Sequence, residues 1–83
     1  MPALVILKLL KPDDARNGEL LTALTDALGW TVPLEARFGR IEIGFVGDTM
    51  EEGMSRVGAA LDQAGAELGV DWTEYLQFAG GMG

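Results

Sequence analysis

Cysteine and histidine are both absent from the 83 residues of this chain. Their absence excludes a disulfide framework, a thiolate nucleophile, a Cys/His zinc site and an imidazole acid or base. No apolar run approaches the roughly 20 residues that a membrane-spanning helix needs, and the longest, residues 3–10, is interrupted by Lys8. We therefore expect a cytoplasmic protein that is not an enzyme and holds neither a metal nor a cofactor.

Basic side chains are also scarce, with 6 Lys and Arg against 13 Asp and Glu and a formal net charge of −7. Binding to a phosphate backbone depends on clustered Lys and Arg, so nucleic acid is not an expected partner. Most of the excess negative charge follows residue 47, where Arg56 is the only basic side chain. This half predicts an acidic surface that faces a partner, formed by Asp48, Glu51, Glu52, Asp62 and Glu67.

Three patterns of hydrophobicity occupy the first half of the chain. Residues 3–10 are apolar on both faces and end at a Pro-Asp-Asp turn, which is typical of a strand central to a sheet. Leucines at helical spacing predict a helix over residues 20–28, with Asp13 or Asn17 as its N-cap and Gly29 as its C-terminal stop. From residue 31 the period changes to two, which predicts a hairpin of two strands, residues 31–38 and 41–45.

The turn of this hairpin can be placed in two ways. With Gly39-Arg40 at its centre, a glycine occupies the position of a type II′ turn that needs a positive φ, and Arg37 faces Glu42. With Phe38-Gly39 at its centre, Arg37 faces Arg40, and like charges directly opposite each other are unfavourable. We therefore predict the Gly39-Arg40 turn.

The second half of the chain begins with a predicted helix over residues 50–68. Two overlapping capping boxes, Asp48 with Glu51 and Thr49 with Glu52, mark its start. Its three internal glycines indicate that the helix depends on packing and comes close to a neighbour. Residues 70–78 fit either a strand, which we favour, or a short helix capped by Asp71. Residues 80–83 predict a flexible Gly-rich tail.

Together these elements follow the order β-α-β-β-α-β. This order is typical of the ferredoxin-like α+β fold, a four-stranded antiparallel sheet of order 4-1-3-2 with both helices on one face. The favoured strand at the C-terminal end completes a second strand-helix-strand unit. We predict one such domain over residues 1–79.

The face of the sheet that the helices leave open is apolar along its first strand, and contiguous exposed apolar area is typical of an interaction site. We predict a small regulatory or interaction module that forms a homodimer, or binds another protein, through this face, with Lys8 and Glu42 as an ion pair near its centre. The sequence leaves open whether two copies also enclose a small ligand between them. A hairpin slipped by one residue, or cover from the chain itself, would remove the surface. The predicted interface residues are Leu4, Ile6, Lys8, Leu10, Arg37, Glu42, Val46 and Trp72.

Two other functions follow from other features of the sequence. The acidic half fits an inhibitor or decoy that binds a basic, nucleic-acid-binding surface of a partner protein. In addition, Pro2 follows the initiator Met and opens a strand, an arrangement that resembles the 4-oxalocrotonate tautomerase family. The resemblance implies that the freed amine of Pro2 acts as a general base, with Lys8, Lys11 and Arg37 as cationic substrate contacts. The acidic turn after the first strand departs from the basic turn of that family.

Overall fold

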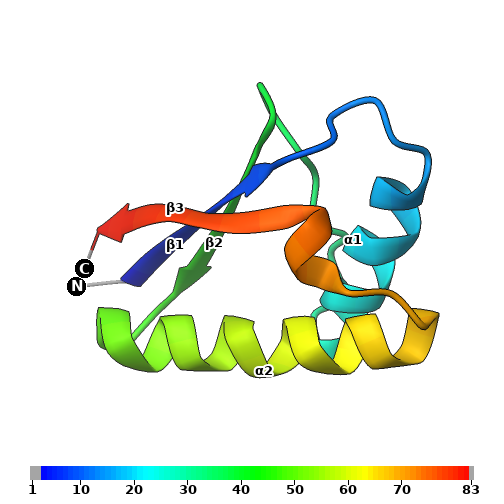
Figure 1. The fold of residues 1–83 in the computed structure, drawn as a ribbon. Coiled ribbons are helices and arrows are strands. Elements are labelled where there is room, and N and C mark those ends of the chain that lie inside the picture. Colours follow the sequence, from blue (N-terminus) through cyan, green and yellow to red (C-terminus); the bar gives the residue numbers. More distant parts are fainter. Residues whose placement is uncertain (1–2, 83) are drawn as a thin grey trace.

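The computed structural model describes the backbone of residues 3–82 and the side chains of residues 3–80. A three-stranded antiparallel sheet of order β2-β1-β3 is covered on one face by two helices (Figure 1). Neither helix in this part of the chain combines the length and hydropathy needed to cross a membrane. The elements are β1 (Ala3–Leu9), α1 (Arg16–Ala27), β2 (Arg40–Phe45), α2 (Met50–Leu68), the 3-10 helix η1 (Trp72–Glu74) and β3 (Leu76–Met82).

The predicted four-stranded ferredoxin-like sheet is wrong, because residues 31–36 form no strand. Pro33 has no N–H to give to a ladder. Leu34 instead donates its N–H to Thr25 Oγ1 of α1 at 3.0 Å, and the Trp30 ring packs 5.7 Å from the ring of Phe45. The segment is thus held by α1 and the core, and it leaves the outer edge of β2 without a neighbouring strand.

The predicted turn is also wrong by one residue. Phe38 and Gly39 occupy its centre with φ values of 54° and 74°, as a type I′ turn requires. Arg37 and Arg40 exchange backbone hydrogen bonds of 2.7 and 3.0 Å across it. Both arginine side chains are exposed, so water screens the like charges that the pairing rule counts against this register.

The core lies between the helices and the inner face of the sheet. Alternate residues of β1 and β2 point into it, with Val5 paired to Ile43 and Leu7 paired to Ile41. Gly53 lets α2 come close to the sheet, since an added Cβ would lie 3.2 Å from the Phe45 ring. The largest fully buried side chains are Leu7, Leu20, Leu24, Ile41, Ile43, Leu61, Leu76, Val5 and Val57.

Both ends of α2 are capped, and its sequence predicted the cap at the start. Thr49 Oγ1 accepts from the Glu52 N–H at 3.1 Å, and Glu52 Oε1 accepts from the Thr49 N–H at 3.0 Å, which confirms that capping box. Gly69 ends the helix in the left-handed conformation. At Gly65 an added Cβ would lie 2.8 Å from the carbonyl oxygen of Val70, so the following chain turns back directly over the helix.

The C-terminal segment contains both of the structures that its sequence allows, one after the other. Asp71 caps η1 by accepting from the Thr73 N–H at 3.0 Å, and β3 then starts at Leu76. Residues 80–82, predicted as part of a tail, belong to this strand, while Gly83 lies outside the described residues. Pro2, with the tautomerase hypothesis that depends on it, also lies outside them.

Candidate interaction surface

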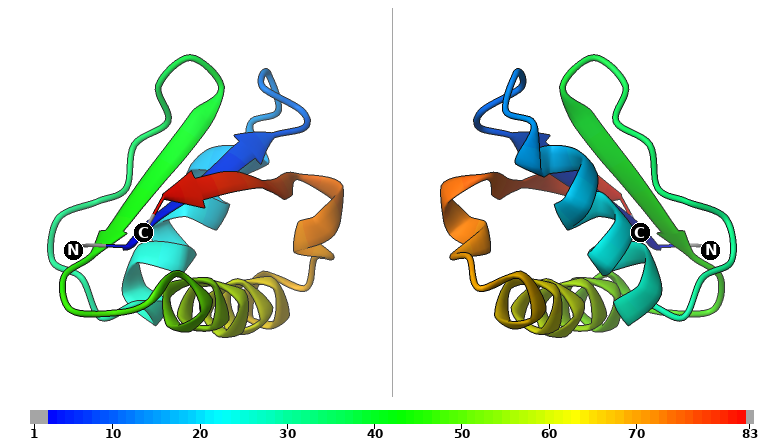
Figure 2. Two further views of the ribbon diagram at one scale, coloured as in Figure 1. Left: turned by 90° about the vertical axis from the view of Figure 1, so that its left-hand side faces the viewer. Right: turned by 90° about the vertical axis from the view of Figure 1, so that its right-hand side faces the viewer.

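The face of the sheet opposite the helices is open along β1 (Figure 2). Leu4 and Ile6 point to this side and are half-buried by their neighbours, while Lys8 is exposed. Gly44 lies opposite Leu4, and Gly80 lies opposite Ile6 on the other side of β1. A Cβ at either glycine would meet nothing within 4 Å. One flank of each apolar side chain therefore lacks a cross-strand side chain, while Glu42 lies on the other side of Ile6.

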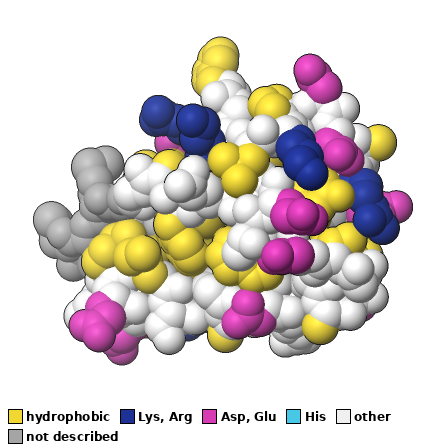
Figure 3. All heavy atoms as spheres, viewed as in Figure 1, with side chains coloured by type: hydrophobic (Ala, Val, Ile, Leu, Met, Phe, Trp, Pro, Cys, Tyr) yellow, Lys and Arg dark blue, Asp and Glu magenta, His cyan; other side chains and the backbone are white. Residues whose placement is uncertain are grey.

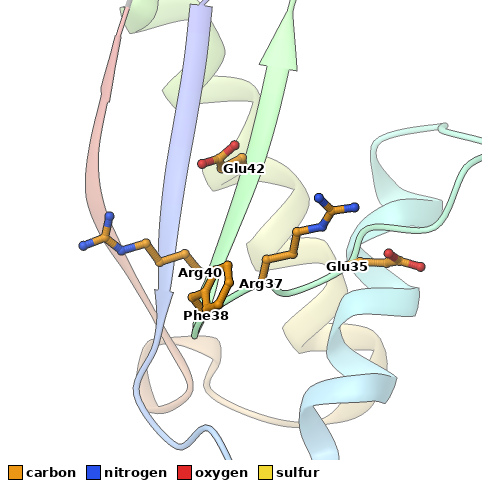
Figure 4. Close-up of a pocket in the computed structure, with 5 residues that line it drawn as sticks. All are labelled: Glu35, Arg37, Phe38, Arg40 and Glu42. Carbon is orange, nitrogen blue, oxygen red and sulfur yellow. The ribbon is translucent and has the colours of Figure 1, made fainter.

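Charged side chains gather at the turn end of the same face. Figure 4 shows Arg40 extending across β1, Arg37 pointing the opposite way, and Glu42 on β2 between them. Together with Glu35 and Phe38 they line an open hollow of about 670 Å³. This end of the face therefore mixes both signs of charge around one aromatic ring.

The predicted ion pair between Lys8 and Glu42 does not form. The register pairs Lys8 with Arg40 and places Glu42 opposite Ile6. Between residues 3 and 80 the ion pairs within 4.0 Å are Arg16 with Glu19 and Arg56 with Asp48, and they leave the cations of the open face unused.

Four of the eight predicted interface residues lie on the open face, and three more lie at its ends. Leu4, Ile6, Lys8 and Glu42 share it, and Leu10 follows at the end of β1 with 41% of its surface exposed. Val46 follows β2 and is 93% exposed. Arg37 lies at the turn.

Trp72 does not belong to this surface, although the sequence includes it there. Its Nε1 donates to Asp62 Oδ1 of α2 at 2.8 Å, and its ring meets the ring of Phe78 edge-on, with centroids 6.1 Å apart. Trp72 thus packs between the C-terminal half of α2 and β3.

Phe38 is the residue of this surface that sequence reasoning missed. Its side chain is 103% exposed, whereas alternation within residues 31–38 predicts an inward position. The available signal was Gly39, which also suits the second position of a type I′ turn. In Figure 3 a hydrophobic group projects at the top of the molecule, where Figure 1 shows the turn before β2.

A second hollow, of about 420 Å³, lies along the β3 edge beside η1. Carboxylates surround this region: Asp62 receives the Trp72 indole N–H, and Asp71 and Glu74 flank the short helix. Hydrogen bonds from the Thr73 hydroxyl and backbone hold the pKa of Asp71 below its usual value of 3.8, so it stays ionised. Cations also lie nearby: Lys8 pairs with Gln77 of the lining, and Lys11 Nζ is 4.6 Å from the centre of the Tyr75 ring. The lining residues are Leu10, Trp72, Thr73, Leu76, Gln77 and Phe78.

The acidic residues predicted to face a partner all lie on α2 or directly before it, and several of them have partners within the chain. Asp48 binds Arg56 at 2.7 Å, Glu52 serves the helix cap, and Glu51 lies beside them at the start of α2. Asp62 is held by Trp72. Glu67 lies apart from them, in a groove against α1. The hypothesis of an acidic decoy stays a prediction.

Basic side chains lie mainly in one part of the molecule, whereas acidic side chains are spread over much of the visible surface (Figure 3). In Figure 3 acidic side chains line α2 along the lower edge, and Lys and Arg side chains lie mainly in the upper part, toward the turn end of the sheet. Within residues 3–82 no group of three or more acidic, His or Cys side chains is arranged to hold a metal ion. Comparison with protein-family models, with curated proteins and with solved structures finds no match to this chain.

Proposed function

We propose that this protein is a non-catalytic interaction module that forms a homodimer through its open sheet face. The observation that carries the proposal is that Leu4 and Ile6 emerge from the central strand on the face that the helices leave bare. A glycine on one neighbouring strand, Gly44 beside Leu4 and Gly80 beside Ile6, leaves one flank of each side chain without a cross-strand side chain. Burial of contiguous apolar surface is the main favourable contribution to association.

A second copy is the occupant that the charge distribution favours. The molecule carries a net charge of −7, so most orientations bring acidic surfaces together. The open face differs, because Lys8 and Arg40 accompany Glu42 there and the acidic surface of α2 points away from it. Two copies therefore meet with the least repulsion when these faces pack, as aligned sheets do at a separation of about 10 Å.

The slipped turn does not remove this surface. It changes only the placement of residues 31–39, whereas the ladder between β1 and β2 runs without a break from Ala3↔Phe45 to Lys8↔Arg40. Because side chains alternate along a strand, an unbroken ladder keeps Leu4, Ile6 and Gly44 on the outer face. The surface is narrower than predicted, since Arg37 now lies at its rim.

Sedimentation velocity of the wild-type chain and of Ile6→Lys tests the proposal. The new ammonium group lies opposite Glu42 in its own chain, so the folded monomer gains a cross-strand pair of opposite charge. In the dimer this charged pair would be buried between the two faces, and its desolvation is costly. We expect a dimer for the wild type and a monomer with an unchanged circular dichroism spectrum for Ile6→Lys.

Ala66→Lys is the matched control, because it adds the same charge to the exposed side of α2. It should associate as the wild type does. A wild-type chain that sediments as a monomer at every soluble concentration would contradict the proposal, as would equal weakening by the two variants.

A further inference from the structure

Phe38 combines two features that do not stabilise an isolated chain. Its ring is fully exposed, so it contributes no burial to the fold. Its φ of 54° lies in the left-handed region, which bulky residues avoid and which type I′ turns normally give to Asn, Asp or Gly. Strain of this kind clusters where it serves binding or catalysis, and an exposed strained aromatic residue at a hairpin tip has the form of a binding anchor.

The surroundings of Phe38 support the same interpretation. Arg37 and Arg40 flank the ring on both sides of the turn and form no ion pair with the described residues. Figure 4 shows the ring on the open side of the sheet, with Arg40 beside it. An aromatic ring next to arginines is the composition typical of the residues that contribute most to protein interfaces.

The hollow at the β3 edge is complementary to this tip. It is lined mainly by apolar side chains, Trp72 and Phe78 among them, and the adjacent η1 brings Asp71 and Glu74. Lys8 pairs with Arg40 on one side and with Gln77 of the hollow on the other. Tip and hollow therefore lie at the same end of the sheet, on opposite sides of β1.

We propose that the Phe38 ring of one copy inserts into the β3-edge hollow of a second copy, where Arg37 and Arg40 face Asp71 and Glu74. A two-fold axis along β1 places the β2 edge of one copy over the β3 edge of the other, so each copy gives one tip and receives one. The inference rests on the sheet-face dimer proposed above and adds its anchor and its orientation.

Phe38→Asn separates this role from a structural one. The variant contains Asn-Gly, the dipeptide most favoured in type I′ turns, so the melting temperature of the monomer should rise. The dissociation constant of the dimer should nevertheless increase about tenfold or more, as for loss of an interface anchor. An unchanged dissociation constant would overturn the proposed insertion.

A charge exchange tests the partner surface. Arg40→Glu gives a tip that repels the acidic rim, and Glu74→Arg gives a rim that repels the tip, so each variant alone should associate more weakly than the wild type. In their mixture both contacts of the heterodimer join opposite charges. Sedimentation of the mixture should therefore recover the dimer that neither variant forms alone, and failure to recover it would contradict the assigned contact.

These outcomes are distinguishable from failure of the sheet-face dimer itself. If Ile6→Lys abolishes the dimer while Phe38→Asn and the charge exchange have no effect, the open face is the interface and the inserted tip is wrong. If the wild-type chain is monomeric, both proposals are wrong.

Discussion

The two faces of β1 differ in what they contribute to the molecule. Val5 and Leu7 point toward the helices and are fully buried, while Leu4 and Ile6, equally apolar, point to a face that nothing in the described chain covers. Burial on the inner face stabilises the fold, since each large side chain removed from water contributes about 1.5–3 kcal/mol. The outer side chains are only half-buried in a single copy and gain part of this contribution. The proposed association through the outer face rests on this difference.

The largest expected effect lies on the inner face. Leu7→Ala should lower the free energy of unfolding by about 2–5 kcal/mol, because it leaves a cavity in a closely packed core. Denaturant-induced unfolding at low protein concentration measures it. Leu4→Ala on the same strand is the matched control and should lower stability far less. Equal losses for the two variants would remove the distinction between the faces.

A second contrast lies within α2, where two glycines have different surroundings. Gly65→Ala should destabilise the protein by about 1–3 kcal/mol, because the new Cβ would lie 2.8 Å from the Val70 carbonyl oxygen. Gly58 has open space at the same position, so Gly58→Ala should raise stability by up to about 1 kcal/mol through helix propensity. Thermal unfolding of the pair should move in opposite directions, and a stabilising Gly65→Ala would refute the close contact.

The start of α2 gives a smaller effect. Thr49→Ala removes the side-chain acceptor of the capping box and should lower the free energy of unfolding by about 1 kcal/mol. Ser55→Ala, six residues further along and exposed, should leave it nearly unchanged. The two variants compared by urea unfolding isolate the cap, and a loss shared equally by both would point to a general effect on the helix.

The smallest effect on stability is expected on the outer face. There a substitution should stabilise the monomer and weaken its self-association. Gly44→Thr should raise the free energy of unfolding of the monomer by about 0.5 kcal/mol, since a β-branched residue suits a strand and meets no neighbour. The added side chain would stand between two packed faces. Light scattering should therefore show weaker self-association of a more stable chain, and unchanged association would place the interface elsewhere.

Hydrophobic periodicity predicted the elements whose observed packing agrees with the sequence pattern. The strand at residues 3–9, both helices and the inward positions Ile41, Ile43 and Phe45 follow from it. So do the outward Leu4 and Ile6, which form the centre of the candidate surface. These predictions depend on the spacing of residues one to four positions apart, and the helices and strands of the folded chain keep that spacing.

The conformation of residues 31–36, before β2, depends on tertiary contacts, and a local sequence pattern does not reveal such contacts. Its alternation is typical of a strand, but Leu34 bonds to Thr25, nine residues earlier, and Val32 is left 73% exposed. The predicted turn differs from the observed one because the pairing rule treats Arg37 opposite Arg40 as repulsive, whereas both side chains are exposed and water screens their charges. The inward position predicted for Phe38 follows from the same one-residue difference.

Nuclear magnetic resonance during dilution tests the central claim most directly, because it reports which face associates. As the wild-type protein is diluted, backbone amide shifts should change along β1 and β2 and at the Phe38 turn, and the exposed side of α2 should keep constant shifts. Shifts independent of concentration everywhere, or changes centred on α2, would contradict association through the open sheet face.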